Sequence, residues 1–226
     1  MRLAVAKPWQ AAVVTEAPAL TESALVVLVP EAEPAVSSWR SDLDPSAALG
    51  VPAHVTLLYP FVKPTGLDDT VLSTVARAIG VSRPFDFALD EVRWFGDTVM
   101  WLAPSPPEPF IVLTQALVDA FPDCPRYGGS VGDEIIPHLT VADGAPLARS
   151  QRAARAVREA LPLRARAQAV ALLVGGRSPM SWRVARKERP SPKIFASSEP
   201  PSRIRETAKC CSRSDTSRSI HICAGG

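Results

Sequence analysis

Two of the three histidines in this sequence stand in the same short pattern. His54 and Thr56 enclose one valine, and His138 and Thr140 enclose one leucine. In a β-strand, residues i and i+2 lie on one face about 6–7 Å apart, so each histidine shares a face with its threonine. The intervening apolar residue then points into the opposite packing layer. The pattern predicts two equivalent polar pairs, each projecting from an apolar strand.

These side chains suit phosphoryl chemistry. An imidazole titrates near neutrality, so one ring can act as general base while the other acts as general acid. Threonine hydroxyls can donate hydrogen bonds to the non-bridging oxygens of a phosphate. One histidine in an apolar strand is more often a core residue than a catalyst, but two placed identically favour a functional interpretation.

The same residues argue against a metal centre. Zinc usually takes three or four protein ligands, and neither motif strand offers a cysteine or a carboxylate beside its histidine. Glu134 and Asp143 flank the second motif, but no carboxylate recurs at the first. No glycine-rich cofactor loop or cysteine cluster is present. We therefore expect no metal and no cofactor.

Apolar runs and helical spacings alternate along the chain, which predicts a mixed fold of the α+β or α/β class. The two histidines lie 84 residues apart, and a helix with strands recurs in each half, so an internal duplication would place the motifs opposite each other across a groove. The expected strands are 24–29, 54–61, 85–95, 99–103, 137–142, 165–174 and 181–185, and the expected helices are 31–48, 68–80, 109–121 and 146–161.

Charge and composition divide the chain of 226 residues into three parts. We expect a poorly ordered leader (1–23), a folded body (24–185) and a disordered, basic tail rich in Ser, Arg and Pro (186–226). Residues 1–185 carry 16 Lys and Arg against 19 Asp and Glu, a net charge of −3, whereas residues 186–226 carry 9 against 4, a net charge of +5. An acidic body disfavours binding to duplex DNA.

Cysteine use and hydropathy indicate a cytoplasmic protein. The body contains only Cys124, so it cannot form an internal disulfide there, and we interpret this residue as structural. No apolar run approaches the roughly 18–20 residues that a spanning helix needs, so we expect no membrane association. We expect a monomer.

The two motifs, in the contexts HVTLLYPF and PHLTVA, resemble those of the 2H phosphoesterase superfamily, which includes the 2′-5′ RNA ligase and cyclic nucleotide phosphodiesterase families. The resemblance covers about residues 24–185. It implies an α+β fold of two lobes, with two antiparallel sheets facing a central cleft and helices outside. It also implies metal-independent cleavage of 2′,3′-cyclic phosphates or 2′-5′ linkages, with His54 and His138 as the acid and base and with Thr56 and Thr140 as phosphate ligands.

The resemblance leaves the two histidine roles open, because the site is nearly symmetric. For hydrolysis of a cyclic phosphate we expect His138 to activate water and His54 to protonate the leaving ribose oxygen. The acidic body favours short substrates, RNA ends or small nucleotides, over long RNA. Two alternatives remain: a nucleotide- or RNA-binding module of the same fold without turnover, and an RNA 2′-5′ ligase.

Other residues are weaker candidates for the rim of the cleft. Tyr127, in the Arg-Tyr-Gly-Gly sequence before the second motif, is a candidate for stacking on a base. Tyr59 and Phe61 could stack in the same way or belong to the core, and Arg126 could meet a second phosphate or be a solvated loop charge. Trp101 is expected in the core. Arginines 149, 152, 155 and 158 form one helical stripe that could follow an RNA backbone or simply face solvent.

Overall fold

The computed structural model describes residues 20–129, 134–176 and 183–184, which form two antiparallel sheets. The first sheet has the strand order β2-β1-β7-β8 and the second has the order β5-β4-β3-β6. The predicted α+β class with two antiparallel sheets is confirmed. The strands of the first sheet are β1 (Glu22–Leu28), β2 (His54–Leu58), β7 (Ala171–Gly175) and β8 (Arg183–Val184), and those of the second are β3 (Phe85–Phe95), β4 (Val99–Ser105), β5 (Leu139–Asp143) and β6 (Leu163–Ala167).

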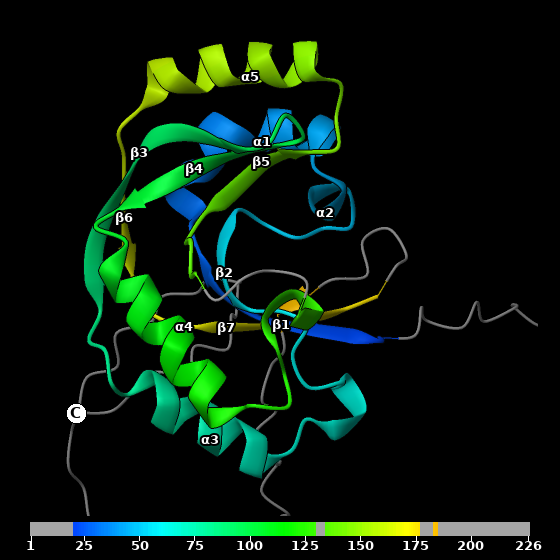
Figure 1. The fold of residues 1–226 in the computed structure, drawn as a ribbon, viewed down its shortest axis with the longest axis vertical. Coiled ribbons are helices and arrows are strands. Elements are labelled where there is room, and N and C mark those ends of the chain that lie inside the picture. Colours follow the sequence, from blue (N-terminus) through cyan, green and yellow to red (C-terminus); the bar gives the residue numbers. More distant parts are fainter. Residues whose placement is uncertain (1–19, 130–133, 177–182, 185–226) are drawn as a thin grey trace, which may run out of the picture.

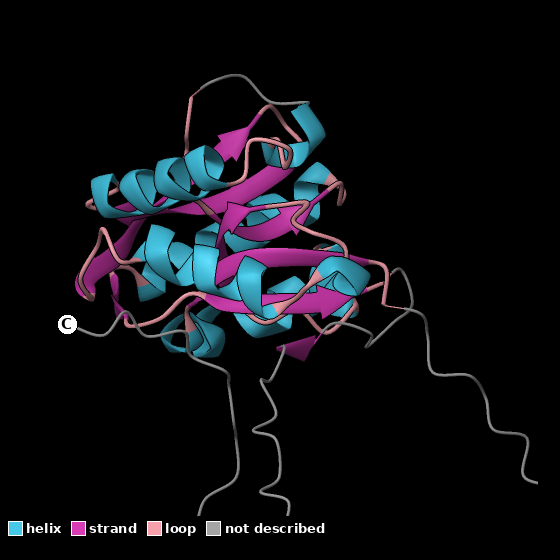
Figure 2. Cartoon of the chain, turned by 90° about the horizontal axis from the view of Figure 1, so that it is seen from below, coloured by secondary structure: helices cyan, strands magenta, loops and turns pink. Residues whose placement is uncertain are grey.

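The helices lie outside the two sheets (Figures 1 and 2). Helices α1 and α5 pack together against the second sheet, and α3 and α4 pack together beside the first (Figure 1). The Asp68 carboxylate accepts a hydrogen bond from the backbone N–H of Val71 at 2.8 Å and so caps α3. The helices are α1 (Glu33–Leu43), α2 (Pro45–Ala48), α3 (Asp69–Ile79), α4 (Glu108–Ala120) and α5 (Leu147–Ala160), and the short 3₁₀ turns are η1 (Pro30–Ala32), η2 (Pro64–Gly66) and η3 (Arg126–Gly129).

The molecule has two halves, each built around one of the two sheets, and the halves exchange a helix. Helix α1 connects β1 to β2 of the first sheet, yet it packs against β5 and α5 of the second half. Helix α4 connects β4 to β5 of the second sheet, yet it packs against β2 and α3 of the first half. Each motif strand is therefore contacted by the helix that precedes the other motif strand. This exchange is consistent with a duplicated fold, and it joins the halves through one continuous core.

Burial separates the two faces of the first sheet. Residues such as Leu25 and Val27 of β1 belong to the main core, which includes residues of both sheets. Val26, between them, points to the other face and packs in a smaller cluster with Leu173 of β7. The side chains of β1 are therefore apolar on both faces, as the continuous run in the sequence predicts.

One strand prediction was wrong. Residues 165–174 do not form a single strand, because the chain changes sheet within this segment. β6 pairs with β3, and β7 pairs with β1. The sequence carried a signal for the break: exposed Arg164 and Arg166 alternate with apolar residues in β6, whereas every residue of β7 is buried.

The expected helix over 31–48 was wrong as one element, because Asp44 is extended and Pro45 begins a separate short helix, so the segment forms α1 and α2. The remaining differences concern element ends. β1 begins at Glu22, inside the expected leader, and β2 ends at Leu58 rather than at residue 61. Residues 1–19 and 185–226, which include nearly all of the expected leader and tail, lie outside the described residues.

The ring of Phe110 provides a test of the core. It is fully buried in α4 and meets the rings of Phe85 and Phe87 edge to face, with each pair of centroids 5.0 Å apart. Phe110→Ala is expected to lower the free energy of unfolding by about 3–5 kcal/mol, measured by urea denaturation, because it leaves a cavity. Val112→Ala on the exposed face of the same helix is the control, expected to change it by less than about 0.5 kcal/mol. Equal effects of the two variants would contradict the described packing.

Candidate active site

The two motif strands meet between the halves of the molecule. β2 and β5 are each at the edge of a sheet, and the two strands contact one another. His54, Thr56, His138 and Thr140 are all half-buried, while the apolar residues that alternate with them are buried. This burial agrees with the faces predicted from the sequence. His54 and Thr56 lie in β2, Thr140 lies in β5, and His138 immediately precedes β5, so two imidazoles and two hydroxyls project from adjoining segments.

Both imidazoles are held in the same way. The Nδ1 atom of His54 lies 2.7 Å from the carbonyl oxygen of Pro52, and that of His138 lies 2.7 Å from the carbonyl oxygen of Ile136. A carbonyl oxygen only accepts hydrogen bonds, so Nδ1 must carry the proton in each ring. The neutral rings consequently keep their lone pair on Nε2, which is the atom that can accept a proton from a substrate or from water.

The surroundings disfavour a charge on either ring. Burial lowers the pKa of His54 from 6.5 to about 4, with a further lowering by the nearby Arg40 cation and by His138, against the opposing effects of the Pro52 carbonyl and of Asp44. Burial also lowers the pKa of His138, against the opposing hydrogen bond to Ile136. Both rings are therefore neutral near pH 7 in the free protein. A phosphate anion bound between them would raise both pKa values.

Arg40 of α1 is a buried cation beneath this pair of strands, with 2% of its surface exposed. Its guanidinium donates hydrogen bonds to the carbonyl oxygen of Val51 at 3.2 Å and to that of Thr140 at 3.1 Å. It also forms an ion pair with Asp44 at 2.8 Å. Val51 lies three residues before His54. The Arg40 side chain therefore links the segment that leads into the first motif with the backbone of the second motif. This role was not predicted from the sequence, although the i, i+4 spacing of Arg40 and Asp44 is typical of a helical ion pair.

The start of α1 also holds the segment that leads into β2. The Glu33 carboxylate accepts a hydrogen bond from the backbone N–H of Ala53 at 2.6 Å. Val51 and Ala53 are therefore fixed from two points, one near each end of α1. This anchoring fixes the position of His54, the next residue along the chain.

Tyr127 connects the two motifs. It lies in η3 with a φ of +49°, a left-handed conformation that a non-glycine residue seldom adopts. Its side chain forms a hydrogen bond with that of Thr56, and its ring lies nearly parallel to the ring of His138, with centroids 6.4 Å apart. Burial raises the pKa of the Tyr127 phenol, an effect that the hydrogen bond with Thr56 opposes. Tyr127 thus contacts both motifs as a neutral hydroxyl.

Two other residues were candidates for the rim of the cleft: Tyr59 lies close to the site, and Phe61 lies in the core. The Tyr59 hydroxyl donates to Glu22 at 2.9 Å, and its ring lies 6.4 Å from that of Tyr127, so it is close to the site. Phe61 is not at the rim: it is buried and packs edge to face on Phe121 with centroids 4.9 Å apart, so it cannot stack on a base.

The side chain of Arg126 stabilises the loop that contains it. Its guanidinium donates to the backbone carbonyl of Glu134 at 3.0 Å.

Cys124 is a free thiol that packs against the main core, and burial raises its pKa.

Aromatic side chains of the second sheet border His138. The centroid of the Phe95 ring is 5.1 Å from that of His138, and the centroid of the Trp101 ring is 5.8 Å from it. Trp101 is buried, as expected, but it also borders the site, which was not predicted from the sequence. Its Nε1 has no hydrogen-bond partner among the described residues. In the pairing of β4 with β5, Trp101 lies opposite Thr140. This pairing brings Trp101 next to the second motif, although the two are far apart in the sequence.

The described residues contain neither a metal-binding cluster nor a membrane span. Within those ranges, no three His, Cys, Asp or Glu side chains gather closely enough to hold a metal ion. In the same ranges, no helix has the length and apolar character needed to cross a membrane.

The Arg40 contacts give a stability test. Arg40→Met is expected to lower the free energy of unfolding by about 3–5 kcal/mol, because it leaves the Asp44 carboxylate buried without its cation. Arg40→Met combined with Asp44→Leu should regain a substantial part of that loss, since no charge is then buried. Arg77→Met on the exposed face of α3 is the control. A loss in the single variant no larger than in the control, by urea denaturation, would show that the pair is not buried as described.

The lowered pKa of His54 predicts a pH dependence of stability. Between pH 6.5 and about 4 the unfolded chain binds a proton at this residue and the folded protein does not, so the free energy of unfolding should fall as pH falls through that window. Above pH 6.5 both states are neutral at His54, and the residue adds no pH dependence. His54→Gln should flatten the curve between these values. Parallel curves for the wild type and the variant would contradict the lowered pKa.

Comparison with solved structures agrees with the fold described above. Among solved structures, TT0787 of Thermus thermophilus matches with a TM-score of 0.51 and 18% identity, covering 73% of this chain and 93% of that protein. E. coli LigT in complex with 3′-AMP matches with a TM-score of 0.48 and 16% identity, covering 74% of this chain and 95% of LigT. The likeness to TT0787 supports the fold. No curated protein matches the chain in sequence.

The family comparison covers both motifs. The family model of the 2′-5′ RNA ligase superfamily matches residues 28–179, which span β2, β5 and the helices that contact them. The match includes most of the described part of the chain. The chain therefore belongs to the 2′-5′ RNA ligase superfamily, the 2H phosphoesterases.

Proposed function

We propose that the protein is a metal-independent phosphodiesterase that cleaves a 2′,3′-cyclic phosphate or a 2′-5′ linkage in RNA ends or small nucleotides. The observation that carries the proposal is the identical setting of His54 and His138. Each ring is held at Nδ1 by a backbone carbonyl and keeps Nε2 for chemistry. Two imidazoles, one in β2 and one immediately before β5, supply a base and an acid for one in-line displacement at phosphorus.

The threonines are the proposed phosphate ligands. Thr56 and Thr140 share the faces of the two histidines, and their hydroxyls can donate to non-bridging oxygens, where negative charge accumulates in the transition state. The Thr56 hydroxyl is oriented by Tyr127, and the backbone of Thr140 is held by Arg40. Groups fixed before the substrate arrives need little reorganisation during the reaction.

The electrostatics favour one assignment of the two histidines. Burial lowers the pKa of His54 further than that of His138, and Arg40 adds to the lowering at His54 while Asp44 opposes it, so a single proton in the site is more stable on His138. We propose that neutral His54 takes a proton from water as the P–O bond to water forms. His138 then donates its proton to the ribose oxygen as the P–O bond to ribose breaks. The expectation from the sequence was the reverse.

Two other activities use the same site. A binding module without turnover would not need both imidazoles. Here both rings are held at Nδ1 by a backbone carbonyl, and both keep Nε2 free to exchange a proton, as catalysis requires. An RNA 2′-5′ ligase would use the same four side chains in the opposite direction. The acidic body favours short nucleotide substrates in either case. We further propose that the protein acts as a monomer in the cytoplasm.

Histidine variants test the proposal directly. Wild type, His54→Ala and His138→Ala would each be given nucleoside 2′,3′-cyclic phosphates and a 2′-5′-linked dinucleotide in the presence of EDTA. Each variant should lose about 10²–10⁴-fold in rate, because each lacks one proton-transfer group. Circular dichroism of each variant is the control for folding. Binding without turnover by the wild type would favour the binding module, and turnover abolished by EDTA would exclude the metal-independent mechanism.

A substrate with a better leaving group tests the two roles. In thymidine 5′-(4-nitrophenyl phosphate) the leaving group departs as a stable anion and does not need a general acid. His138→Ala should therefore lose about tenfold or less on this diester, while His54→Ala should keep a loss of about 10²–10⁴-fold. The opposite result would assign the base to His138 and the acid to His54.

A further inference from the structure

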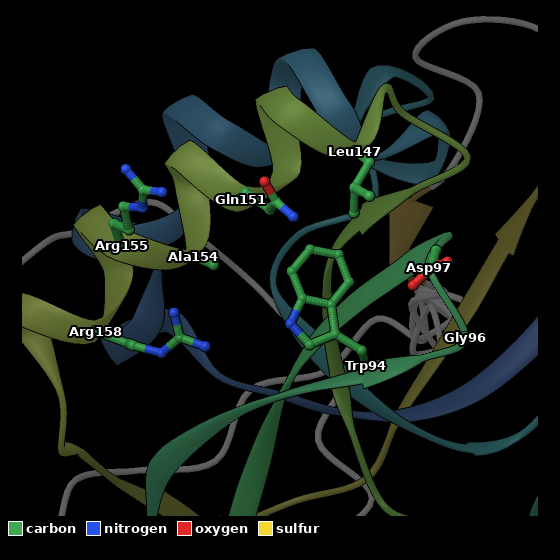
Figure 3. Close-up of a pocket in the computed structure, with 8 residues that line it drawn as sticks. All are labelled: Trp94, Gly96, Asp97, Leu147, Gln151, Ala154, Arg155 and Arg158. Carbon is green, nitrogen blue, oxygen red and sulfur yellow. The ribbon is translucent and has the colours of Figure 1, made fainter.

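A cavity in the described part of the protein lies away from the histidines. It has a volume of about 520 Å³ and lies between α5 and the end of β3 (Figure 3). Side chains alternate along a strand, and Phe95 contacts His138, so the neighbouring Trp94 faces the other side of the second sheet, under α5. The cavity is therefore separated from the candidate active site by the thickness of one sheet. Its volume is in the range of small-molecule sites.

One side of this cavity combines an aromatic ring with cations. Trp94 is half-buried at its base, and Gln151, Arg155 and Arg158 line it from one face of α5. Figure 3 shows the Arg158 guanidinium and the Gln151 amide pointing toward the Trp94 indole, whereas the Arg155 guanidinium lies at the outer rim and points away from the ring. The indole face can stack on a planar ring, and the guanidiniums can bind an anion.

The two cations are available to a ligand. Arg155 and Arg158 are exposed, and neither side chain forms a hydrogen bond or an ion pair in the part of the chain that the structure describes. Other arginines nearby are already engaged: Arg149 pairs with Asp42 at 3.2 Å, and Arg166 pairs with Asp86 at 2.7 Å. A basic helix face is usually just solvated, but here two unpaired guanidiniums border a hollow with an aromatic base.

The opposite end of the cavity carries a carboxylate. Asp97 lies in the turn between β3 and β4, beside Gly96, which has a φ of +54°. In Figure 3 it is at the far end of the cavity from Arg158, with the Trp94 ring between them. A carboxylate repels an anion but accepts hydrogen bonds from N–H groups. The cavity thus suits a ligand with an anion at one end, a planar ring in the middle and N–H donors at the other end.

We propose that this cavity is a second binding site, for a nucleotide whose base carries an exocyclic amino group. The base stacks on Trp94, the phosphate lies at Arg155 and Arg158, and the amino group donates to Asp97. A free nucleoside monophosphate and a nucleotide within a single-stranded RNA share this chemistry. The site does not depend on the histidine chemistry proposed above.

Indole N–H resonances of the full chain can separate the two sites. The sequence contains five tryptophans, and Trp94→Phe and Trp101→Phe identify the signals of these two. Trp101 borders His138 and reports the candidate active site, whereas Trp94 reports the second site. AMP would be titrated into the wild type and into His138→Ala. Saturable movement of the Trp94 signal is expected in both proteins, and a Trp94 signal that does not move at millimolar AMP would overturn the proposal.

Charge variants provide matched controls. Arg155→Gln with Arg158→Gln should weaken the AMP affinity reported by Trp94 at least tenfold. Arg152→Gln removes one charge from the same helix outside the cavity and should change that affinity less than twofold. UMP lacks the amino group and should bind several-fold more weakly than AMP, a difference that Asp97→Asn should reduce. Equal weakening by Arg152→Gln and by the paired variant, or equal affinity for AMP and UMP, would overturn the proposal.

A short oligoadenylate distinguishes the two sources of the nucleotide. If the site holds part of an RNA strand, the oligomer should bind more tightly than AMP. The paired arginine variant should then lose that advantage while cleaving a mononucleotide cyclic phosphate at the wild-type rate. If the site holds a free nucleotide, AMP should bind as tightly as the oligomer. Movement of the Trp101 signal alone by both ligands would overturn the second site while leaving the proposed catalytic function intact.

Discussion

The buried guanidinium of Arg40 is the interaction on which the candidate site depends. Removing an arginine from water is costly unless its charge and its donors are all satisfied, and here the partners are the Asp44 carboxylate and the carbonyl oxygens of Val51 and Thr140. One of these carbonyls precedes the first motif and the other lies within the second. The cation is therefore fully compensated only when both motif strands are in place. The electrostatic requirement of one side chain thus sets the relative position of two segments that are far apart in the sequence.

The surroundings make a nearly symmetric site chemically unequal. The two motifs have the same spacing, and both rings form the same 2.7 Å contact with a preceding carbonyl. By local structure alone they would titrate alike. Burial lowers the pKa of His54 further than that of His138, and Arg40 adds to this lowering while Asp44 opposes it, so the two rings differ in how readily they accept a proton. A general acid and a general base can in this way arise from two copies of one motif.

The helix exchange explains how the halves hold this arrangement. Helix α1 supplies Arg40 to the second half, and α4 covers β2 of the first half. Neither motif strand is packed by its own half alone, and the main core includes residues of both sheets. The phenol of Tyr127 adds a further link, because it contacts Thr56 of one motif and its ring contacts His138 of the other. The polar groups of the site are therefore positioned by contacts that cross between the halves.

The sequence by itself determined what depends on local periodicity: the faces of the two His-x-Thr strands, the mixed fold class, and the positions of most helices. These follow from the repeat of side-chain direction along a strand or helix, which involves only near neighbours. The tertiary structure decided the partners of Arg40, the contact of Tyr127 with both motifs, the burial of Phe61, and which sheet β6 and β7 each join. Each depends on a contact between residues distant in sequence, such as Arg40 with Thr140, and no local pattern encodes which distant segment will supply the partner.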